Sequence, residues 1–120
     1  MLKIRIDKLD TLFARYVKLR ANYECEYCGK RAKSQGMHCA HFIGRRYKNT
    51  RWITDNAACL CMACHNLMHD FSTIHNEFFT KRLGSDRVEQ LEIIARTYAV
   101  PDKKKIEADL KEKIKLLEEV

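Results

Sequence analysis

Apolar residues recur at intervals of three and four in the first and the central parts of the chain. Residues 7–21 show this spacing, which predicts an amphipathic helix with one apolar side. Residues 62–81 show it again, which predicts one long helix that ends at Gly84. The core-facing residues expected are Leu9, Leu12, Phe13, Tyr16 and Val17 in the first helix, and Leu67, Phe71, Ile74 and Phe78 in the second.

Two further helical segments follow Gly84, and Pro101 separates them. Asp86 and Glu89 stand three residues apart, a spacing typical of a capping arrangement at the start of a helix. The last twenty residues carry six Lys and six acids, so we expect this neutral tail to pack on the body of the protein or on a second copy. The apolar stripes are Val88, Leu91, Ile94, Ala95 and Tyr98, then Ile106, Leu110, Ile114 and Leu117.

The stretch between the first two predicted helices has strand and turn signals instead. Residues 23–36 contain a Cys pair, Gly29 and a polar turn, which indicates a knuckle. Short apolar-biased runs at 37–43 and 57–60 predict two strands. Residues 44–55 carry four basic and two aromatic side chains without a sustained period, which predicts a surface loop.

These elements predict an α+β fold and a single domain over residues 1–120. An N-terminal helix is expected within residues 1–22, a core with two strands within 23–70, and a helical C-terminal extension within 71–120. The chain is 46% apolar, which is enough for one core, and it contains no repeat or Gly/Ser-rich linker.

The charge of the chain favours a polyanionic partner. Lys and Arg number 23 against 16 Asp and Glu, a formal net charge of +7, and the neutral tail leaves this excess in residues 1–100. A nucleic acid matches such a charge. No apolar run reaches the roughly 18 residues that span a bilayer, and the first residues lack the apolar core of a signal peptide. We therefore expect a cytoplasmic protein with no membrane partner.

The cysteines point to a metal. Six cysteines in a cytoplasmic chain of this size are better explained by metal binding than by disulfides, because the cytoplasm keeps thiols reduced. Four of them form two C-x-x-C pairs, which suit a tetrahedral structural Zn²⁺. The alternative, redox-active or incidental pairs, has no second thioredoxin-like feature to support it. The pairs are Cys25 with Cys28 and Cys61 with Cys64.

Two cysteines remain outside these pairs. Cys39 and Cys59 are expected to be small, buried, apolar residues. Cys59 lies two residues before Cys61, so on a strand it would share the face of that ligand and could compete with it.

Histidines gather around the second Cys pair. His65 and His69 are four residues apart, so they lie on one side of the predicted helix, roughly opposite its apolar stripe. A histidine pair turned away from the core suggests a second metal site, and two solvated histidines are the alternative. His38 and His41 belong to the first predicted strand. His75 lies off the histidine face, and we assign it no role.

The region from about Cys25 to His69 resembles the zinc-stapled HNH nucleases. The resemblance lies in the order of three motifs: C-x-x-C, then A-H-F-I-G-R-R, then D-N-A-A-C-L-C-M-A-C-H. This resemblance implies a small ββα-metal core with a zinc knuckle, flanked here by the N-terminal and C-terminal helices, and hydrolysis of phosphodiester bonds in DNA. With the R-W and D-N motifs, the chain is most similar to the NinG (Rap) recombination endonucleases of lambda-like phages. That similarity implies branched, Holliday-junction-type DNA as the substrate, and a phage or prophage origin in a bacterial cytoplasm.

The resemblance also implies roles for individual residues. His41 would be the general base, and Asn56 would fix the loop and orient the base or help hold the metal. His65 would close the motif as a ligand of the catalytic cation. His69 falls where the nuclease colicins carry a further metal-ligating histidine.

The chain departs from the HNH pattern at Ala40. That position usually carries Asp, or His in the colicins, and donates a metal ligand, which alanine cannot do. The missing ligand could be replaced by more water or by a neighbouring side chain. The alternative is that the site is catalytically inactive. The candidate replacements are His38, Asp55 and Asp70.

The resemblance implies a catalytic divalent cation, namely Mg²⁺, Mn²⁺, Ni²⁺ or Zn²⁺. Mg²⁺ keeps several of its own waters and would tolerate an incomplete ligand set. Imidazole nitrogens suit the transition metals better, so Mn²⁺ or Ni²⁺ is expected to support activity better than Mg²⁺.

The loop after the first predicted strand is the candidate DNA contact. Basic residues in it are interleaved with Tyr47 and Trp52, so they could follow phosphates while an aromatic ring stacks on a splayed base. The alternative is that these basic residues are simply exposed to solvent and have no ligand. In either case we expect the Trp52 side chain to be buried in the core. The predicted DNA-binding residues are Arg45, Arg46, Lys48 and Arg51.

Three function classes stay open. The first is an HNH endonuclease on branched DNA, for which a homodimer is attractive because two strands need two active sites. The second is the same chemistry on duplex DNA, as in homing, packaging or restriction nucleases. The third is a non-catalytic zinc module that only binds nucleic acid, which Ala40 keeps open.

Overall fold

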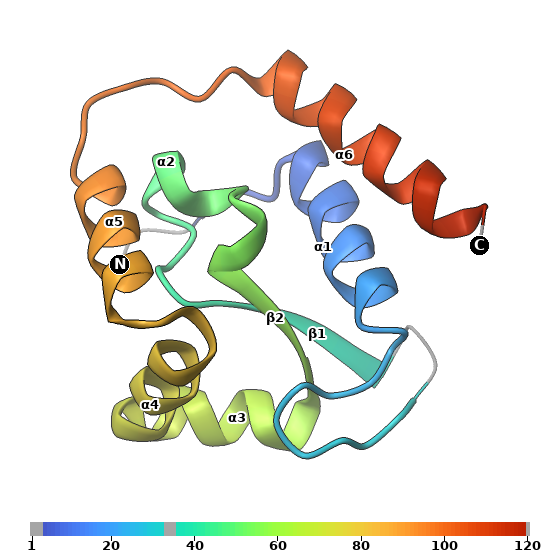
Figure 1. Cartoon of the computed structure of the whole chain (residues 1–120), viewed down its shortest axis with the longest axis vertical. Helices are drawn as coiled ribbons and strands as arrows, with labels where there is room; N and C mark the ends of the chain where they lie inside the picture. Colours follow the sequence, from blue (N-terminus) through green and yellow to red (C-terminus); the bar gives the residue numbers. More distant parts are fainter. Residues whose placement is uncertain (1–3, 33–35, 120) are drawn as a thin grey trace.

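A two-stranded antiparallel sheet and six α-helices make up the described part of the chain (Figure 1). The computed structural model describes residues 4–32 and 36–119, so part of the predicted knuckle lies outside the described residues. The α+β class is confirmed. In chain order the elements are α1 (Lys8–Arg20), β1 (Met37–His41), α2 (Lys48–Arg51), the 3₁₀ turn η2 (Thr54–Asn56), β2 (Ala57–Cys61), α3 (Met62–Asp70), α4 (Ser72–Leu83), α5 (Ser85–Ala95) and α6 (Lys103–Glu118).

The hairpin of β1 and β2 lies between α1 and α3, and both helices contact both strands. The register pairs Met37 with Cys61 at one end and His41 with Ala57 at the other. β2 is buried along its whole length, which explains its small and apolar residues. Both predicted strands are therefore confirmed, and the first is shorter than expected.

Helix α1 forms where the pattern predicted it and begins with a capping box. The Asp7 side chain accepts a hydrogen bond from the backbone N–H of Leu9 at 2.9 Å, and the Asp10 side chain accepts one from the N–H of Asp7 at 2.7 Å. Phe13 and Val17 follow Leu9 at helical spacing, and all three are buried in the main core. The predicted apolar side of this helix is confirmed.

The single long helix predicted for residues 62–81 is wrong, because the chain breaks into α3 and α4 at Phe71. That residue has an extended backbone, with φ −125° and ψ 95°, and its side chain is 55% exposed. Met68 and Phe79 are buried instead. The change of direction brings Phe79 against Phe42, with ring centroids 5.2 Å apart. Gaps of three and four cannot distinguish one straight helix from two helices joined at a bend.

Gly84 separates α4 from α5 as predicted, with φ +85°, a conformation that glycine adopts without strain. The start of α5 differs from the prediction, because the helix begins at Ser85 and Asp86 lies inside its first turn rather than capping it. Leu91 is buried as expected. Tyr98 is not part of the apolar side, since the helix ends at Ala95 and the Tyr98 side chain is fully exposed.

Helix α6 packs along α1, so the neutral tail lies on the body of the protein (Figure 1). Leu110 and Ile114 are buried, and Arg15 of α1 forms an ion pair with Glu118 at 2.6 Å. None of the helices in the described ranges combines the length and the hydrophobicity that crossing a bilayer requires.

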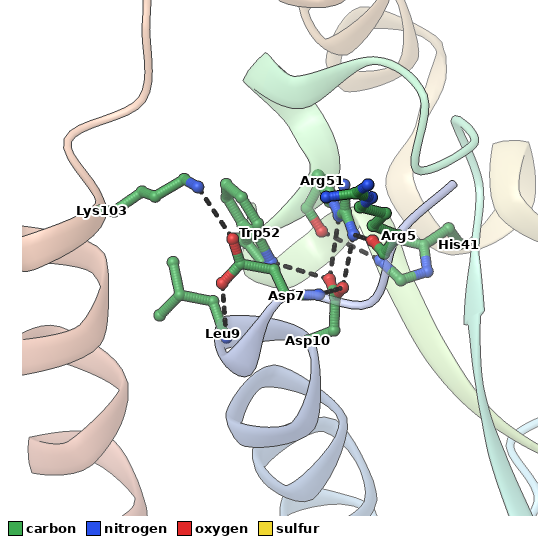
Figure 2. Close-up of polar contacts among 8 residues, drawn as sticks. All are labelled: Arg5, Asp7, Leu9, Asp10, His41, Arg51, Trp52 and Lys103. Atoms are coloured by element: carbon green, nitrogen blue, oxygen red, sulfur yellow. Dashed lines mark hydrogen bonds and ion pairs between the residues drawn. The ribbon is translucent and has the colours of Figure 1, made fainter. Parts of the chain in front are cut away.

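The predicted surface loop at 44–55 is partly wrong, because its second half turns inward as α2 and η2. Trp52 is buried, as expected. Arg51 is buried too, and its guanidinium binds both carboxylate oxygens of Asp10 and donates to the carbonyl of Arg5 at 2.8 Å (Figure 2). The indole N–H of Trp52 donates to the same Asp10 carboxylate at 3.0 Å. Arg51 is thus engaged in the core, with its guanidinium paired to Asp10 rather than free on the surface.

This ion pair is nearly closed to solvent, with side chains 7% exposed for Arg51 and 10% for Asp10. Burial by itself would raise the pKa of Asp10. Hydrogen bonds from Arg51, from the N–H of Asp7 and from Trp52 outweigh that effect and hold the pKa of Asp10 below its usual value. The pair therefore joins α1 to the loop between the strands as a charged contact.

Replacing Asp10 by Asn should lower the free energy of unfolding by about 3 kcal/mol, because the buried Arg51 cation would lose its counter-charge. Urea unfolding at neutral pH measures this loss, with the exposed Asp109→Asn of α6 as the matched control. The contribution of Asp10 is present above the unfolded pKa near 3.8 and is lost as pH falls through its lower folded pKa. Equal stability of the two variants would contradict a structural role for the pair.

Candidate functional site

Four cysteines come together where the knuckle meets the end of β2 and the first turn of α3. Their sulfur atoms all lie within 4.8 Å of one another, and those of Cys28 and Cys61 are 3.8 Å apart. A tetrahedron of thiolates around Zn²⁺, with Zn–S of about 2.3 Å, has an edge of about 3.8 Å. The donor set and its spacing therefore fit a metal ion. The members are Cys25, Cys28, Cys61 and Cys64.

The backbone around Cys25 is arranged to stabilise a thiolate. Burial alone would raise the pKa of this thiol, but backbone N–H groups of Cys28, Cys61 and Tyr27 donate to its sulfur and lower the pKa to about 7. The pKa of Cys64 is raised, first by burial and then by hydrogen bonds among the neighbouring sulfurs. A bound cation would relieve this crowding, because it replaces the shared protons.

Cys39 and Cys59 stay outside the four-cysteine cluster. They face each other as register partners on β1 and β2. Burial raises the pKa of Cys39 to about 12 and that of Cys59 to about 11, so both remain protonated thiols. Cys59 is fully buried, as expected, whereas Cys39 is half-buried. The competition of Cys59 for the metal does not occur in this arrangement.

A contact that the sequence did not suggest fixes the knuckle to β2. The backbone N–H of Glu26 donates to the carbonyl of Cys59 at 2.8 Å, and the Glu26 carboxylate accepts from the N–H of Cys59 at 2.6 Å. Arg82 of α4 forms an ion pair with the same carboxylate. Glu26 therefore links the first Cys pair, the strand that leads to the second pair, and α4.

Asn56 closes the loop between the strands. Its side-chain oxygen accepts from the N–H of Ile43 at 2.9 Å, and its amide donates to the carbonyls of Ile43 and Thr50 at 3.1 and 2.9 Å. The side chain is fully buried, and the Asn56 carbonyl accepts from Phe42. Loop fixation, the first role expected for Asn56, is thus what its contacts provide.

His41 lies at the end of β1 beside α1. Its Nε2 is 2.9 Å from the carbonyl of Arg51, and its ring stacks on Phe13 with centroids 5.5 Å apart. Burial lowers the pKa of His41, and the positive charge of Arg45 adds to that shift. His41 is therefore neutral at pH 7.

His38 and His65 form a separate pair between β1 and α3, with ring centroids 5.1 Å apart. Burial, with the neighbouring imidazoles of His38 and His69, lowers the pKa of His65. The His69 side chain is 86% exposed and lies 3.6 Å from Asp70. Within the described ranges, the four-cysteine cluster is the only group of three or more His, Cys, Asp or Glu ligand atoms close enough to share an ion.

The histidines are not gathered in one place. His38 and His41 are three positions apart on a strand, so they point to opposite faces of the hairpin. His41 contacts α1, whereas His38 contacts the His65 ring of α3. The convergence of positions 41, 65 and 69 that the resemblance implies is therefore not present as a cluster of side chains.

The structure also shows the contacts of Asp55 and His75. Asp55, one of the candidate replacement ligands, is engaged with Arg87 of α5 at 2.7 and 3.0 Å, so its carboxylate already has a cationic partner. His75, to which no role was given, bonds the carbonyl of Phe42 at 3.0 Å and packs against Phe79.

The remaining basic residues predicted to contact DNA line one hollow of about 490 Å³ beside the N-terminal segment. These residues are Arg45, Arg46 and Lys48. Arg5 and Lys103 line the same hollow, although the sequence pattern did not predict them as DNA-binding residues. Neither could have been found by its spacing, because they come from opposite ends of the chain.

Comparison with known proteins identifies no relative. No protein-family model matches the chain, and neither a curated protein nor a solved structure matches it. The chemistry of the site is therefore inferred from its own residues: four thiols that fit a metal, the neutral, half-buried imidazole of His41, the half-buried pair of His38 and His65, and a basic hollow.

Replacing Cys64 by Ser should abolish tight metal binding and destabilise the fold, because a structural metal site of this kind supplies about 10 to 16 kcal/mol of folding free energy. Elemental analysis of the purified chain should give one metal ion per molecule, and thermal unfolding should shift strongly downward in the variant. Cys39→Ser is the matched control and should keep its metal. Full metal content in Cys64→Ser would refute the four-thiolate site.

Proposed function

We propose that this protein is a metal-dependent endonuclease of the HNH type that hydrolyses phosphodiester bonds in DNA, with Zn²⁺ as the structural metal of the four-cysteine cluster. The observation that carries the proposal is the arrangement around Asn56. A strand, a loop tied by that side chain, a second strand and a helix follow one another, and the strand before the loop ends in a neutral histidine beside a basic hollow.

His41 is the proposed general base. A carbonyl oxygen can only accept a hydrogen bond, so the bond to Arg51 requires the proton of the neutral ring to sit on Nε2. Nδ1 then carries the lone pair that can take a proton from water. The lowered pKa keeps this nitrogen free of a proton at neutral pH.

The proposed catalytic cation is a divalent metal at His65 and His69, with His38 as the further ligand in place of Ala40. The contact between the rings of His38 and His65 supports this set. A bound cation there would supply Lewis-acid chemistry, which requires that the scissile phosphate reach both this face of the hairpin and His41. Nitrogen donors favour Mn²⁺, Ni²⁺ or Zn²⁺ over Mg²⁺.

We propose branched or otherwise structured DNA of the Holliday-junction type as the substrate, cut during phage recombination in a bacterial cytoplasm by a homodimer with two active sites. This part rests on the sequence resemblance and on the net charge of +7. Cleavage of plain duplex DNA is the alternative within the same chemistry.

One observation favours a second function, a non-catalytic zinc module that binds nucleic acid. His41 and His38 point to opposite faces of the hairpin, and in the described ranges no histidine belongs to a group of three close metal ligands. A protein of this kind would use the basic hollow without needing a general base.

Replacing His41 by Gln tests the base. The glutamine amide can still donate to the Arg51 carbonyl, but it cannot accept a proton from water, so cleavage should fall by about 100- to 10,000-fold. The assay uses a four-way junction, a flap and a linear duplex with Mn²⁺ or Mg²⁺, beside thermal unfolding to verify the fold. In the unaltered protein, kcat/KM should rise with pH and level off with a midpoint below 6.5, because burial lowers the pKa of His41.

Cleavage by His41→Gln at the unaltered rate would contradict the assignment of the base. Binding without cleavage by the unaltered protein, on every substrate and with every cation, would favour the non-catalytic module. Preference for the duplex over the junction would replace the branched substrate.

A double change of His65 and His69 to Ala tests the cation. Activity should be lost with Mn²⁺ and Ni²⁺ because both imidazole donors are gone, while DNA binding should change little since neither histidine lines the basic hollow. Thermal unfolding verifies that the variant folds. Rates with each cation over a concentration series measure the effect. Equal rates with Mg²⁺ alone, with or without both histidines, would contradict imidazole ligation.

A further inference from the structure

The basic hollow is formed by three parts of the chain that are far apart in sequence. They are the segment before α1, the loop after β1 and the first residue of α6. Of its ten lining residues, six are Lys or Arg and one is an acid. The lining residues are Ile4, Arg5, Ile6, Asp7, Arg45, Arg46, Lys48, Arg51, Trp52 and Lys103.

Two of the six cations are already neutralised. Arg51 is paired with Asp10, and Lys103 lies 2.8 Å from Asp7. The other four have no carboxylate partner among the residues that the structure describes, so four positive charges face one hollow. Like charges that line one hollow repel one another, and a ligand with several negative charges would relieve the repulsion. The four are Arg5, Arg45, Arg46 and Lys48.

A second hollow of about 350 Å³ adjoins the first and shares Arg46 and Lys48 with it. Its walls carry two tyrosines. The Arg46 guanidinium covers the ring of Tyr47 at 4.9 Å, and it donates to the Tyr47 hydroxyl at 2.9 Å. Tyr98, from the segment after α5, is fully exposed with a relative exposure of 101%. An aromatic ring thus stands open to solvent beside a basic surface.

Specific contacts hold the backbone next to this tyrosine. Asn49 of α2 donates to the carbonyl of Thr97 at 2.7 Å and to its hydroxyl at 2.8 Å. The Asp55–Arg87 ion pair ties α5 to the same loop. The residue next to Thr97 is therefore fixed against the basic loop, although its own side chain makes no buried contact.

We propose that the two hollows form one binding site for single-stranded DNA, in which the four cations hold successive phosphates and Tyr98 stacks on an unpaired base. Exposed rings beside a basic track suit this ligand, since every base has a face that can stack once it is unpaired. An acidic protein would match the charge of the hollow but would offer no unpaired base for Tyr98 to stack on. The inference rests on the proposed function only in taking DNA as the ligand.

The test measures binding of a short, fluorescently labelled oligonucleotide to the full, metal-loaded chain by anisotropy, without added divalent cation. The same measurement is made with the duplex of that sequence and with an oligonucleotide whose bases are removed. Tyr98→Ala should weaken binding of the single strand about tenfold, by loss of one stacked base, and leave the abasic strand unchanged. Tyr98→Phe should bind as the unaltered protein does.

Arg5→Gln tests the phosphate contacts. It should weaken binding to all three DNAs and reduce the slope of log K against log salt by about 0.7 on the single strand, since one phosphate contact is lost. Lys81→Gln, an exposed lysine of α4, is the matched control and should leave the slope unchanged. Thermal unfolding of each variant verifies that these exposed side chains are not needed for folding.

Three results would overturn the inference. They are an equal effect of Arg5→Gln and Lys81→Gln, an equal effect of Tyr98→Ala on normal and abasic strands, and competition by polyglutamate as strong as by DNA, which would indicate an acidic protein partner. Failure of the nuclease proposal looks different, because binding would follow the predicted pattern while no DNA is cut.

Discussion

The buried ion pair between Asp10 and Arg51 is the contact on which the functional face depends. Through its side chain, Arg51 joins the loop between the strands to α1 and to the carbonyl of Arg5, and through its own carbonyl it holds His41. Trp52 bonds the same carboxylate. One desolvated pair thus sets the position of the proposed base and of one wall of the basic hollow. A buried cation without its partner is costly, so separating the pair would destabilise this part of the fold.

The hairpin is held at both ends by different chemistry. At the end where Met37 pairs with Cys61, the four cysteines and the Glu26 contacts join the knuckle to β2 and α3. At the other end, Asn56 closes the loop and the ion pair ties it to α1. The C-terminal helices then add to this rigid centre rather than forming a separate unit, since α6 packs along α1 and supplies Lys103 to the hollow.

Several local signals in the sequence predicted the fold correctly, whereas long-range contacts were not visible in it. The apolar side of α1, the stop at Gly84, the two Cys pairs and the burial of Trp52 each depend on residue type and spacing within a short stretch. The break at Phe71 and the burial of Arg51 depend on partners that only the fold supplies. Asp10 lies 41 positions from Arg51, so a run of basic residues could not reveal that one member points inward.

The most direct test of the account is a crystal structure of the His41→Gln protein bound to single-stranded DNA, which this variant should cut at least about 100-fold more slowly. The account predicts a phosphate in contact with Arg5 and Arg45, close to position 41, with an unpaired base on Tyr98. A DNA backbone that makes no contact with Arg5, Arg45 or Tyr98 and leaves the basic hollow empty would contradict it.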